Sequence, residues 1–207
     1  MSQAPDMQDG AISSADKNNI PRPRAGFLSR WDTLIGPGST AAEQWLILGT
    51  ALAGAAVAVW AGRGLGWTAA QWAVVVIIAL DLFGGVPGNA TVSSRRWYHR
   101  PGRRPQDHFI FVAIHLFHLI PVVLFFDTGW LWVAGAYGYL LILAVVILAV
   151  PSYLRGAVAL VATMGGVLLA LYALPAVPGL EWLLPVFYLK LLAGHLGAVE
   201  HTIQTGN

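Results

Sequence analysis

The 207-residue chain contains no cysteine, which excludes disulfides, iron–sulfur clusters, thiolate zinc sites and a cysteine nucleophile. Charge is scarce as well. The 12 Lys and Arg and the 10 Asp and Glu make up 11% of the residues, against about 25% in an ordinary soluble domain. The sequence also lacks the Gly-x-Ser-x-Gly, His-Glu-x-x-His and phosphate-loop motifs. These absences argue against a soluble globular enzyme and against a nucleic-acid-binding protein.

Apolar residues dominate the chain instead. They make up 57% of the sequence, nine tryptophans are present, and the mean hydropathy is +0.63. The apolar residues form six runs of about 18–24 residues, and a helix of that length crosses a hydrocarbon layer ~30 Å thick. We therefore predict an all-α integral membrane protein, a bundle of six transmembrane helices. The predicted spans are Gln44–Ala61, Thr68–Val86, His108–Phe126, Gly129–Val150, Tyr153–Ala176 and Glu181–Glu200.

The basic residues are distributed unevenly over the ends of these spans. Ten of them fall on the side that the two termini share, and Arg63 falls on the other side. The positive-inside rule predicts that both termini are cytoplasmic, in a multi-pass protein of the plasma (inner) membrane of a bacterium. Residues 1–43 are predicted to form a polar, partly disordered cytoplasmic tail, in which the amphipathic stretch Phe27–Ile35 lies on the membrane or serves as a linker. Residues 44–207 form the predicted membrane domain, with a basic cytoplasmic loop over 87–107.

Ionisable side chains inside the predicted spans are candidates for function, because placing each in lipid costs about 3 kcal/mol. Counting 1.5 Å per residue puts Asp81, His115 and His195 at a similar depth, in the cytoplasmic half of the membrane. His118 and His108 share a helix face with His115. Neutral imidazole is the commonest metal ligand, so His115, His118 and His195 are predicted to ligate a metal ion or the iron of a b-type haem. The alternative is that these histidines only hydrogen-bond neighbouring helices.

Asp81 is the predicted catalytic residue, since a carboxylate beside imidazoles can orient a ligand or accept a proton. Lys190 is predicted to form a structural pair with Asp81, in which each charge neutralises the other. The same pair also permits a second interpretation, in which it couples protons or substrate in a transporter. His99 lies outside the spans, and its replacement is expected to have little effect.

The segment after Asp81 is rich in glycine and contains Pro87. It is predicted to unwind the end of the second span and to open a polar recess with Asn89 at its mouth. An arginine-rich loop follows. Its guanidinium groups are expected to contact anionic lipid headgroups or to bind phosphate or carboxylate groups of a substrate. The arginines are Arg95, Arg96, Arg100, Arg103 and Arg104.

Together these features predict a polytopic inner-membrane protein with a cytoplasm-facing intramembrane His/Asp site, which binds a metal ion or haem and acts on a lipophilic substrate. Two alternatives stay open. One is a non-catalytic accessory or assembly subunit of a membrane complex, and the other is a small proton-coupled transporter. The expected partners are membrane lipids and other membrane subunits, and nucleic acid is not expected.

Overall fold

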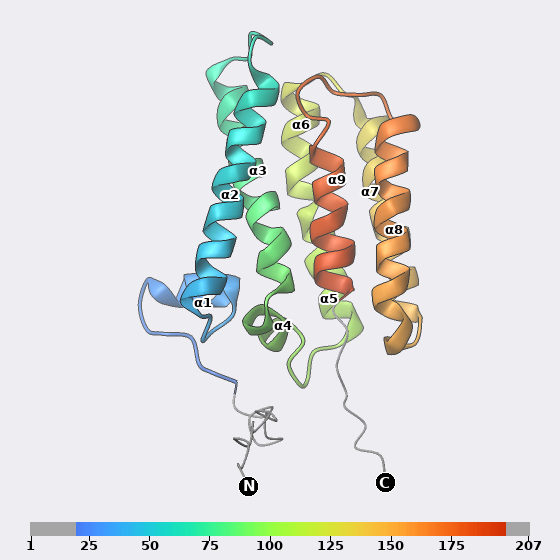
Figure 1. Cartoon of the computed structure of the whole chain (residues 1–207). Helices are drawn as coiled ribbons and strands as arrows, with labels where there is room; N and C mark the ends of the chain where they lie inside the picture. The colour runs from blue at the N-terminus through green and yellow to red at the C-terminus, as the bar shows by residue number, and fades with distance from the viewer. Residues whose placement is uncertain (1–19, 198–207) are drawn as a thin grey trace, which may run out of the picture.

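The computed structural model describes residues 20–197, and every regular element in that range is a helix. Five helices are long and apolar enough to cross a membrane. Figure 1 shows them as neighbouring rods of one bundle, with the short helices α1 (Leu28–Ile35) and α4 (Val92–Tyr98) at one end. The five are α2 (Ala41–Gly62), α3 (Ala69–Ala90), a composite helix of α5 (Pro105–Ile114), η1 (His115–His118) and α6 (Leu119–Phe125), α7 (Trp130–Ala149) and α8 (Ser152–Tyr172).

The prediction of an all-helical fold is confirmed, and five of the predicted spans correspond to these five helices, each long and apolar enough to cross a membrane. The sixth is shorter and consists of α9 (Leu183–Tyr188) followed by the π-helix η2 (Leu189–Leu196). It begins below the ends of its neighbours in Figure 1, because the preceding chain turns into the bundle and buries Val177 and Leu180. The predicted end of this span, Glu200, lies outside the described residues.

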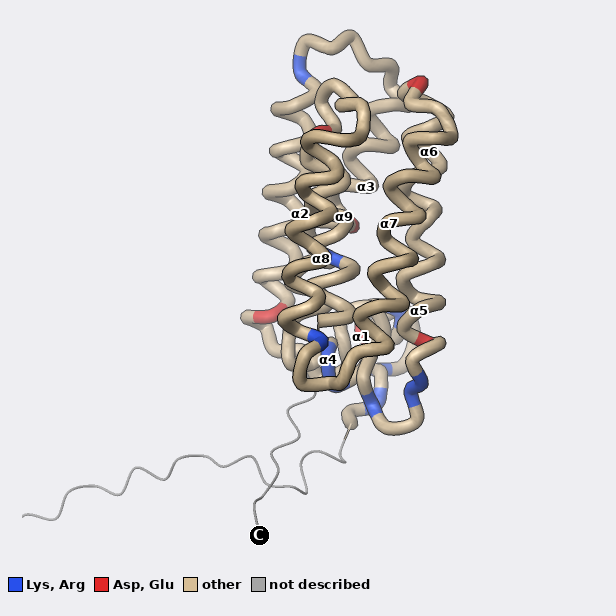
Figure 2. The backbone as a smooth tube through the Cα atoms, turned by 90° about the vertical axis from the view of Figure 1, so that its right-hand side faces the viewer, with Lys and Arg blue, Asp and Glu red and all other residues tan. Residues whose placement is uncertain are grey.

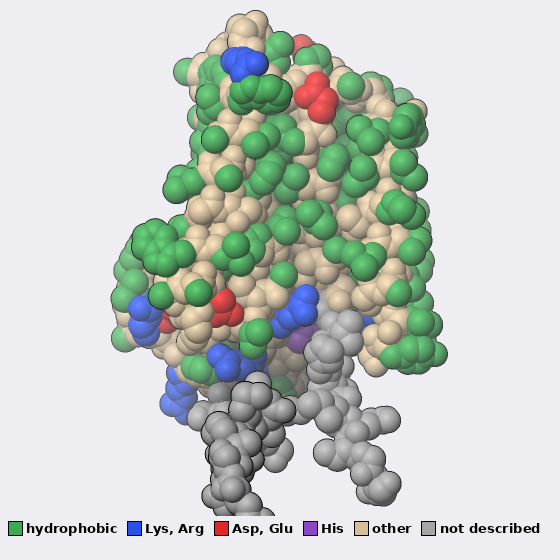
Figure 3. Space-filling model, in the orientation of Figure 1, with side chains coloured by type: hydrophobic (Ala, Val, Ile, Leu, Met, Phe, Trp, Pro, Cys, Tyr) green, Lys and Arg blue, Asp and Glu red, His purple; other side chains and the backbone are tan. Residues whose placement is uncertain are grey.

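The helix formed by α9 and η2 is the core of the bundle. It packs against α3, α7 and α8. Its buried side chains are those of Leu183, Leu184, Phe187, Tyr188, Lys190, Leu191, Leu192, His195 and Leu196. The surrounding helices expose large apolar side chains, and Figure 3 shows hydrophobic groups over the length of one face. An apolar exterior of this kind suits lipid as the surrounding solvent.

Both α2 and α3 begin with a capping box. The Thr40 hydroxyl accepts the Glu43 N–H (3.2 Å), and the Glu43 carboxylate accepts the Thr40 N–H (2.8 Å). Thr68 and Gln71 make the same pair of bonds at the start of α3 (3.3 and 2.8 Å). Since the first N–H groups of a helix lack partners within it, these boxes explain why both helices begin here.

The composite third helix changes its winding in the middle. The α-helix gives way to a 3₁₀ turn at η1, and α6 resumes at Leu119. Pro121 accounts for the change, because it has no N–H for the Phe117 carbonyl and its ring crowds that carbonyl. Side chains three residues apart eclipse in a 3₁₀ turn. His118 therefore lies directly over His115, and their rings stack with centroids 5.2 Å apart.

The predicted unwinding at the end of the second span is wrong. α3 continues through Gly84, Gly85 and Pro87 to Ala90, and the Thr91 N–H donates to the Pro87 carbonyl (2.9 Å). Proline removes one backbone hydrogen bond, but packed neighbours support the remainder of the helix within a bundle. The basic segment 87–107 accordingly contains the last turn of α3, the short α4, the turn that follows it and the first residues of α5.

The amphipathic stretch in the N-terminal segment forms α1, which packs against α4. Asp32 on α1 is 3% exposed, and its carboxylate accepts from the Arg24 guanidinium (2.6 Å). Hydrogen bonding to Arg24 holds the pKa of Asp32 below its ordinary value. The Tyr98 hydroxyl donates to the Thr33 carbonyl (3.1 Å) and so ties α1 to the arginine-bearing α4.

Tyrosine hydroxyl groups connect neighbouring helices inside the bundle. Each donates to a backbone carbonyl of another helix, which satisfies a polar group that has no water at this depth. The bonds run from Tyr137 to Ala113 (2.7 Å), from Tyr139 to Ala162 (2.7 Å) and from Tyr188 to Ala136 (3.0 Å).

Replacing Tyr188 by phenylalanine tests this connection. Tyr188 is fully buried, and Tyr188→Phe removes its hydroxyl while keeping the ring. Interhelical hydrogen bonds of this kind contribute about 0.6 kcal/mol, with a maximum of about 1.7 kcal/mol. We expect a lower midpoint of thermal unfolding in detergent. Tyr172→Phe, at a side chain that is 82% exposed, is the matched control and should leave the midpoint unchanged. Equal effects of both changes would contradict the interpretation.

Candidate functional site

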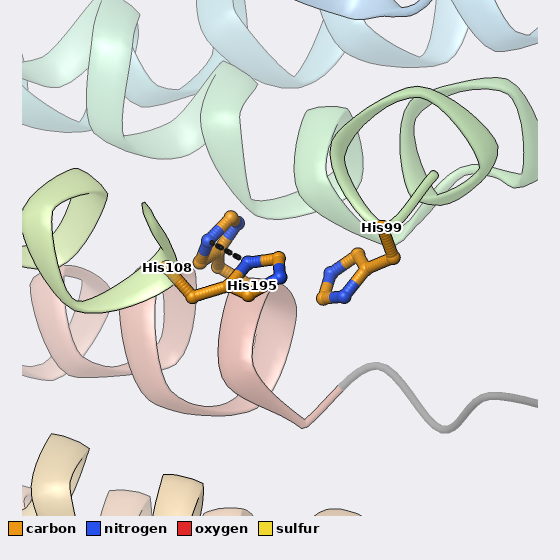
Figure 4. Close-up of side chains that lie close together, drawn as sticks. All are labelled: His99, His108 and His195. Carbon is orange, nitrogen blue, oxygen red and sulfur yellow. Dashed lines mark hydrogen bonds between the residues drawn. The ribbon is translucent and has the colours of Figure 1, made fainter. Parts of the chain in front are cut away.

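Three histidines from separate elements converge at the end of the bundle that carries α4. Figure 4 shows the imidazoles of His99, His108 and His195 close together, and one ring nitrogen of each lies within 4.8 Å of the others. His108 Nδ1 lies 3.2 Å from His195 Nε2, and the rings of His99 and His108 stack with centroids 4.4 Å apart. His99 and His108 are half-buried, whereas His195 is 2% exposed. We call this group the histidine cluster.

Helix ends bring the first two of these histidines together. His99 caps the C-terminus of α4, where its N–H donates to the Arg95 carbonyl (2.9 Å). Gly102, at φ +89°, lies in the turn that reverses the chain between α4 and α5. His108 follows in the first turn of α5 and so returns beside His99. Glycine suits this turn because it adopts positive φ without strain.

The third histidine, His195, comes from the π-helix η2. The Gly197 N–H donates to the Leu192 carbonyl five residues back (2.8 Å), which is the hydrogen-bond pattern of a π-helix. π-helical turns are rare in proteins, and those that occur are often at functional sites. Phe111 stacks on the His195 ring with centroids 4.0 Å apart, and Tyr98 meets the ring edge at 5.9 Å. Aromatic packing on two sides therefore holds the imidazole in one orientation.

The surroundings of His99 favour its neutral form. Burial, followed by the neighbouring His108, Arg95 and Arg155, lowers the pKa of His99 from its ordinary 6.5 to about 4. At neutral pH the ring is therefore uncharged. Neutral imidazole is the form that binds a metal ion.

The spacing of the histidine cluster suits a single transition-metal ion. Imidazole nitrogens bound to zinc at ~2.0–2.1 Å lie about 3.3 Å from one another in tetrahedral geometry. The 3.2 Å between His108 and His195 already matches this separation. Three imidazole ligands leave the fourth position of a tetrahedral ion open for water or substrate.

A second polar group, which we call the Asp81 cluster, lies deeper in the bundle. One carboxylate oxygen of Asp81, Oδ2, lies 2.5 Å from Lys190 Nζ and 2.5 Å from His118 Nε2. Lys190 is 4% exposed and His118 is 1% exposed, whereas the Asp81 side chain is 40% exposed. Opposite charges thus meet among apolar side chains, where an unpaired charge would be costly.

Glycine and asparagine on α3 make this arrangement fit. The Lys190 side chain passes Gly85, where a Cβ atom would overlap its methylene groups. The Asn89 amide donates to the Lys190 carbonyl (3.2 Å), and Asn89 is 7% exposed. Asn89 therefore joins α3 to η2 in the interior instead of lying at the mouth of a recess.

His115 lies between the two clusters. Its Nδ1 is 2.6 Å from the Phe111 carbonyl, and its ring stacks on His118 at an interplanar angle of 10°. The Phe111 ring contacts His115 on one side (centroids 4.8 Å) and His195 on the other (4.0 Å). Phe111 therefore separates the two groups of imidazoles.

The structure divides the predicted site residues between the two clusters. His195 belongs to the histidine cluster, whereas His118 belongs to the Asp81 cluster. Asp81 and His195 do not share a depth, since His195 contacts His108 and Asp81 contacts His118 further along the same helix. The reason is that the sixth helix begins deeper in the bundle than its apolar run suggests.

Two members of the histidine cluster, His99 and His108, were outside the predicted ligand set. His99 was expected to have little effect, yet its imidazole lies against the other two. The sequence does contain a signal for this. Pro101 and Gly102 mark a reverse turn between the two histidines, and such a turn brings its flanking residues together.

Of the predicted arginines, Arg95 lies one helical turn before His99 on α4, and its carbonyl accepts the His99 N–H. The remaining four have other surroundings. Arg96 Nη2 lies 3.5 Å from the Pro37 carbonyl, Arg100 stacks on Trp97 at 4.0 Å, Arg103 is exposed, and the Arg104 N–H donates to Asp107 (2.9 Å).

In comparisons with known proteins, no family model, no curated protein and no solved structure matches the chain.

A double-mutant cycle tests the pairing of Asp81 with Lys190. Asp81→Asn leaves a buried ammonium facing an amide, which we expect to destabilise the protein by about 3 kcal/mol. Lys190→Met leaves a partly exposed carboxylate and should cost less. The double variant should be more stable than the sum of the two losses implies. Denaturant unfolding in detergent measures all four proteins.

Glu181→Gln serves as the control, because Glu181 is an exposed acid at the other end of the sixth helix. It should leave the free energy of unfolding unchanged. Strict additivity of Asp81→Asn and Lys190→Met would show that the two side chains do not interact.

Proposed function

We propose that this protein is a metal-binding protein of a bacterial plasma membrane, in which His99, His108 and His195 hold a zinc-type ion at the cytoplasmic end of the bundle. The observation that carries the proposal is the convergence of three imidazole nitrogens within 4.8 Å, from three separate elements. The substrate class is lipophilic, because the site lies where apolar helices end at a membrane surface.

The ligand chemistry supports an ion with an open coordination position. Three neutral imidazoles and a fourth, exchangeable ligand are typical of catalytic zinc sites, whereas structural zinc sites are closed by four protein ligands. When bound, such an ion polarises a substrate oxygen or lowers the pKa of its water. His195 is held by the stacked ring of Phe111 and the edge contact of Tyr98, and His99 is kept neutral, so the chain itself orients the ligands and keeps them in the metal-binding form.

A haem is the less suitable cofactor for this cluster. Axial imidazoles approach haem iron from opposite faces of a flat macrocycle. The ring nitrogens of His108 and His195 are 3.2 Å apart, and the rings of His99 and His108 stack on each other. These contacts leave room for an ion and no room for a macrocycle.

The proposed topology has six crossings with both termini in the cytoplasm. The helix formed by α9 and η2 is the sixth crossing. It is shorter than the others because it begins inside the bundle, below the upper ends of α7 and α8 in Figure 1. Figure 2 shows Lys and Arg residues gathered around α4 and α5, at one end of the bundle. The positive-inside rule assigns that end to the cytoplasm.

Proton-coupled transport is the second candidate, and the Asp81 cluster favours it. Intramembrane carboxylate, imidazole and ammonium groups in mutual contact are typical of proton relays. Two of the three residues also lie on irregular helix segments, His118 on the 3₁₀ turn and Lys190 on the π-helix. In the accessory-subunit alternative, the histidine cluster and the Asp81 cluster bind no ligand and only hold the helices together.

Metal content tests the proposed function. Purified protein incubated with zinc and freed of excess should retain about one ion per chain, because the three imidazoles form one site. His108→Ala and His195→Ala should each lose it. His115→Ala is the matched control, because this imidazole lies outside the histidine cluster, and it should retain zinc. Elemental analysis together with gel filtration measures metal and folding on the same samples.

Two results would contradict the proposal. One is a folded wild-type protein without bound metal, and the other is unchanged zinc in His195→Ala. Either result would leave the accessory-subunit and transporter alternatives. Proton flux into vesicles that is lost in Asp81→Asn would favour the transporter, and its absence would favour the accessory subunit.

Cysteine labelling tests the topology, since the chain has no cysteine of its own. Leu65→Cys lies between α2 and α3 and Arg103→Cys between α4 and α5, both at exposed positions. A membrane-impermeant maleimide should label Leu65→Cys in intact cells and Arg103→Cys only after permeabilisation. The reverse pattern would overturn the assignment of the histidine cluster to the cytoplasmic side.

A further inference from the structure

Two arginines approach the histidine cluster from different helices. Arg95 lies on α4 one turn before His99, so both side chains project from the same helix face. Arg155 lies in the first turn of α8. One turn further along α8, Ala159 packs against Gly197, which follows His195 by two residues. Arg155 therefore reaches the end of the bundle at which His195 lies.

The guanidinium groups of these arginines keep donors without partners. Among residues 20–197, the Nε atoms of Arg95 and Arg155 are buried and make no hydrogen bond. Arg155 Nη2 has one long contact, 3.5 Å from the Leu148 carbonyl. Buried donors without acceptors cost free energy, and such groups in a folded protein call for an explanation. Figure 3 shows Lys or Arg groups directly beside a histidine on this part of the surface.

Among residues 20–197, Arg95 and Arg155 bring two positive charges toward the histidine cluster, and Asp107 brings one negative charge beside His108. The Asp107 carboxylate accepts from the backbone N–H of Arg104 (2.9 Å), a bond that leaves its negative charge in place. A divalent ion held by neutral imidazoles beside two guanidinium groups and one carboxylate leaves a net positive charge, which favours an anionic ligand.

We propose that Arg95 and Arg155 bind the phosphate group of an anionic ligand, one oxygen of which occupies the open position on the metal of the histidine cluster. This inference rests on the proposed metal centre and names the chemical class of its ligand. Guanidinium binds phosphate through paired hydrogen bonds. A phosphate monoester carries a charge of about −1.5 to −2 at neutral pH, more than a carboxylate provides.

The phosphate can belong to a lipid headgroup or to a soluble phosphate, because the cluster lies where the helices leave the membrane. Both sources present the same tetrahedral oxygens to the arginines and the ion. The experiment therefore uses inorganic phosphate as one probe and phosphatidic acid in phosphatidylcholine nanodiscs as the other.

Cobalt reports ligand binding at the ion directly. Co²⁺ accepts the imidazole ligands that zinc takes, and its visible absorption changes when a ligand is exchanged. We expect a saturable shift of the cobalt absorption bands with inorganic phosphate, with phosphatidic acid, or with both, and the effective probe identifies the source. Arg95→Gln and Arg155→Gln should each weaken phosphate binding about tenfold or more. Arg63→Gln, at the opposite end of the bundle, should bind as the wild type does.

The outcomes separate the two proposals. A cobalt-loaded protein whose spectrum responds to neither probe overturns the phosphate site and leaves the metal centre intact. Wild-type affinity in both arginine variants also overturns it, as does loss of cobalt from those variants, since the arginines would then support the metal site itself. A protein that binds no cobalt overturns both proposals.

Discussion

The absence of water inside a bilayer is the constraint on which the rest of this structure depends. Every ionisable or polar side chain at that depth needs a partner from the chain itself. Asp81 meets this requirement for Lys190 and His118 through one carboxylate oxygen, and the Ala136 carbonyl meets it for the Tyr188 hydroxyl. The sixth helix consequently lies in the core, because it carries the buried lysine and the most buried histidine of the histidine cluster.

The same constraint accounts for the separation of the two clusters. Deep in the bundle, a carboxylate and an ammonium group neutralise each other and leave their helices tied together. Near the end of the bundle that carries α4, where α4 and the turn into α5 are partly exposed, three imidazoles meet, and Arg95 lies one helical turn before one of them. Neutral imidazoles tolerate burial and bind metal ions, so this end of the bundle is chemically suited to a ligand. Phe111 contacts the ring of His195 in the histidine cluster and the ring of His115, which stacks on His118 of the Asp81 cluster.

The fold was largely predictable from the sequence, because a helix that crosses a bilayer needs about 20 consecutive apolar residues and such runs are easily recognised. The contact of Lys190 with Asp81 followed from the same reasoning about unpaired charge. The composition of the histidine cluster did not follow. A depth count assumes that every helix starts at the membrane surface and winds regularly, whereas the sixth helix starts deeper and winds as a π-helix around His195. His99 belongs to the cluster because the reverse turn at Gly102 brings it beside His108. Counting depth within each span separately does not include such contacts between segments.

Anomalous X-ray scattering from crystals of the zinc-loaded protein tests the central claim most directly. A difference map at the zinc absorption edge locates the ion without reference to activity. The account predicts one peak about 2 Å from ring nitrogens of His99, His108 and His195, and none at the Asp81 cluster. A peak between His115 and His118, or a zinc-loaded crystal without a peak at the histidine cluster, would contradict it.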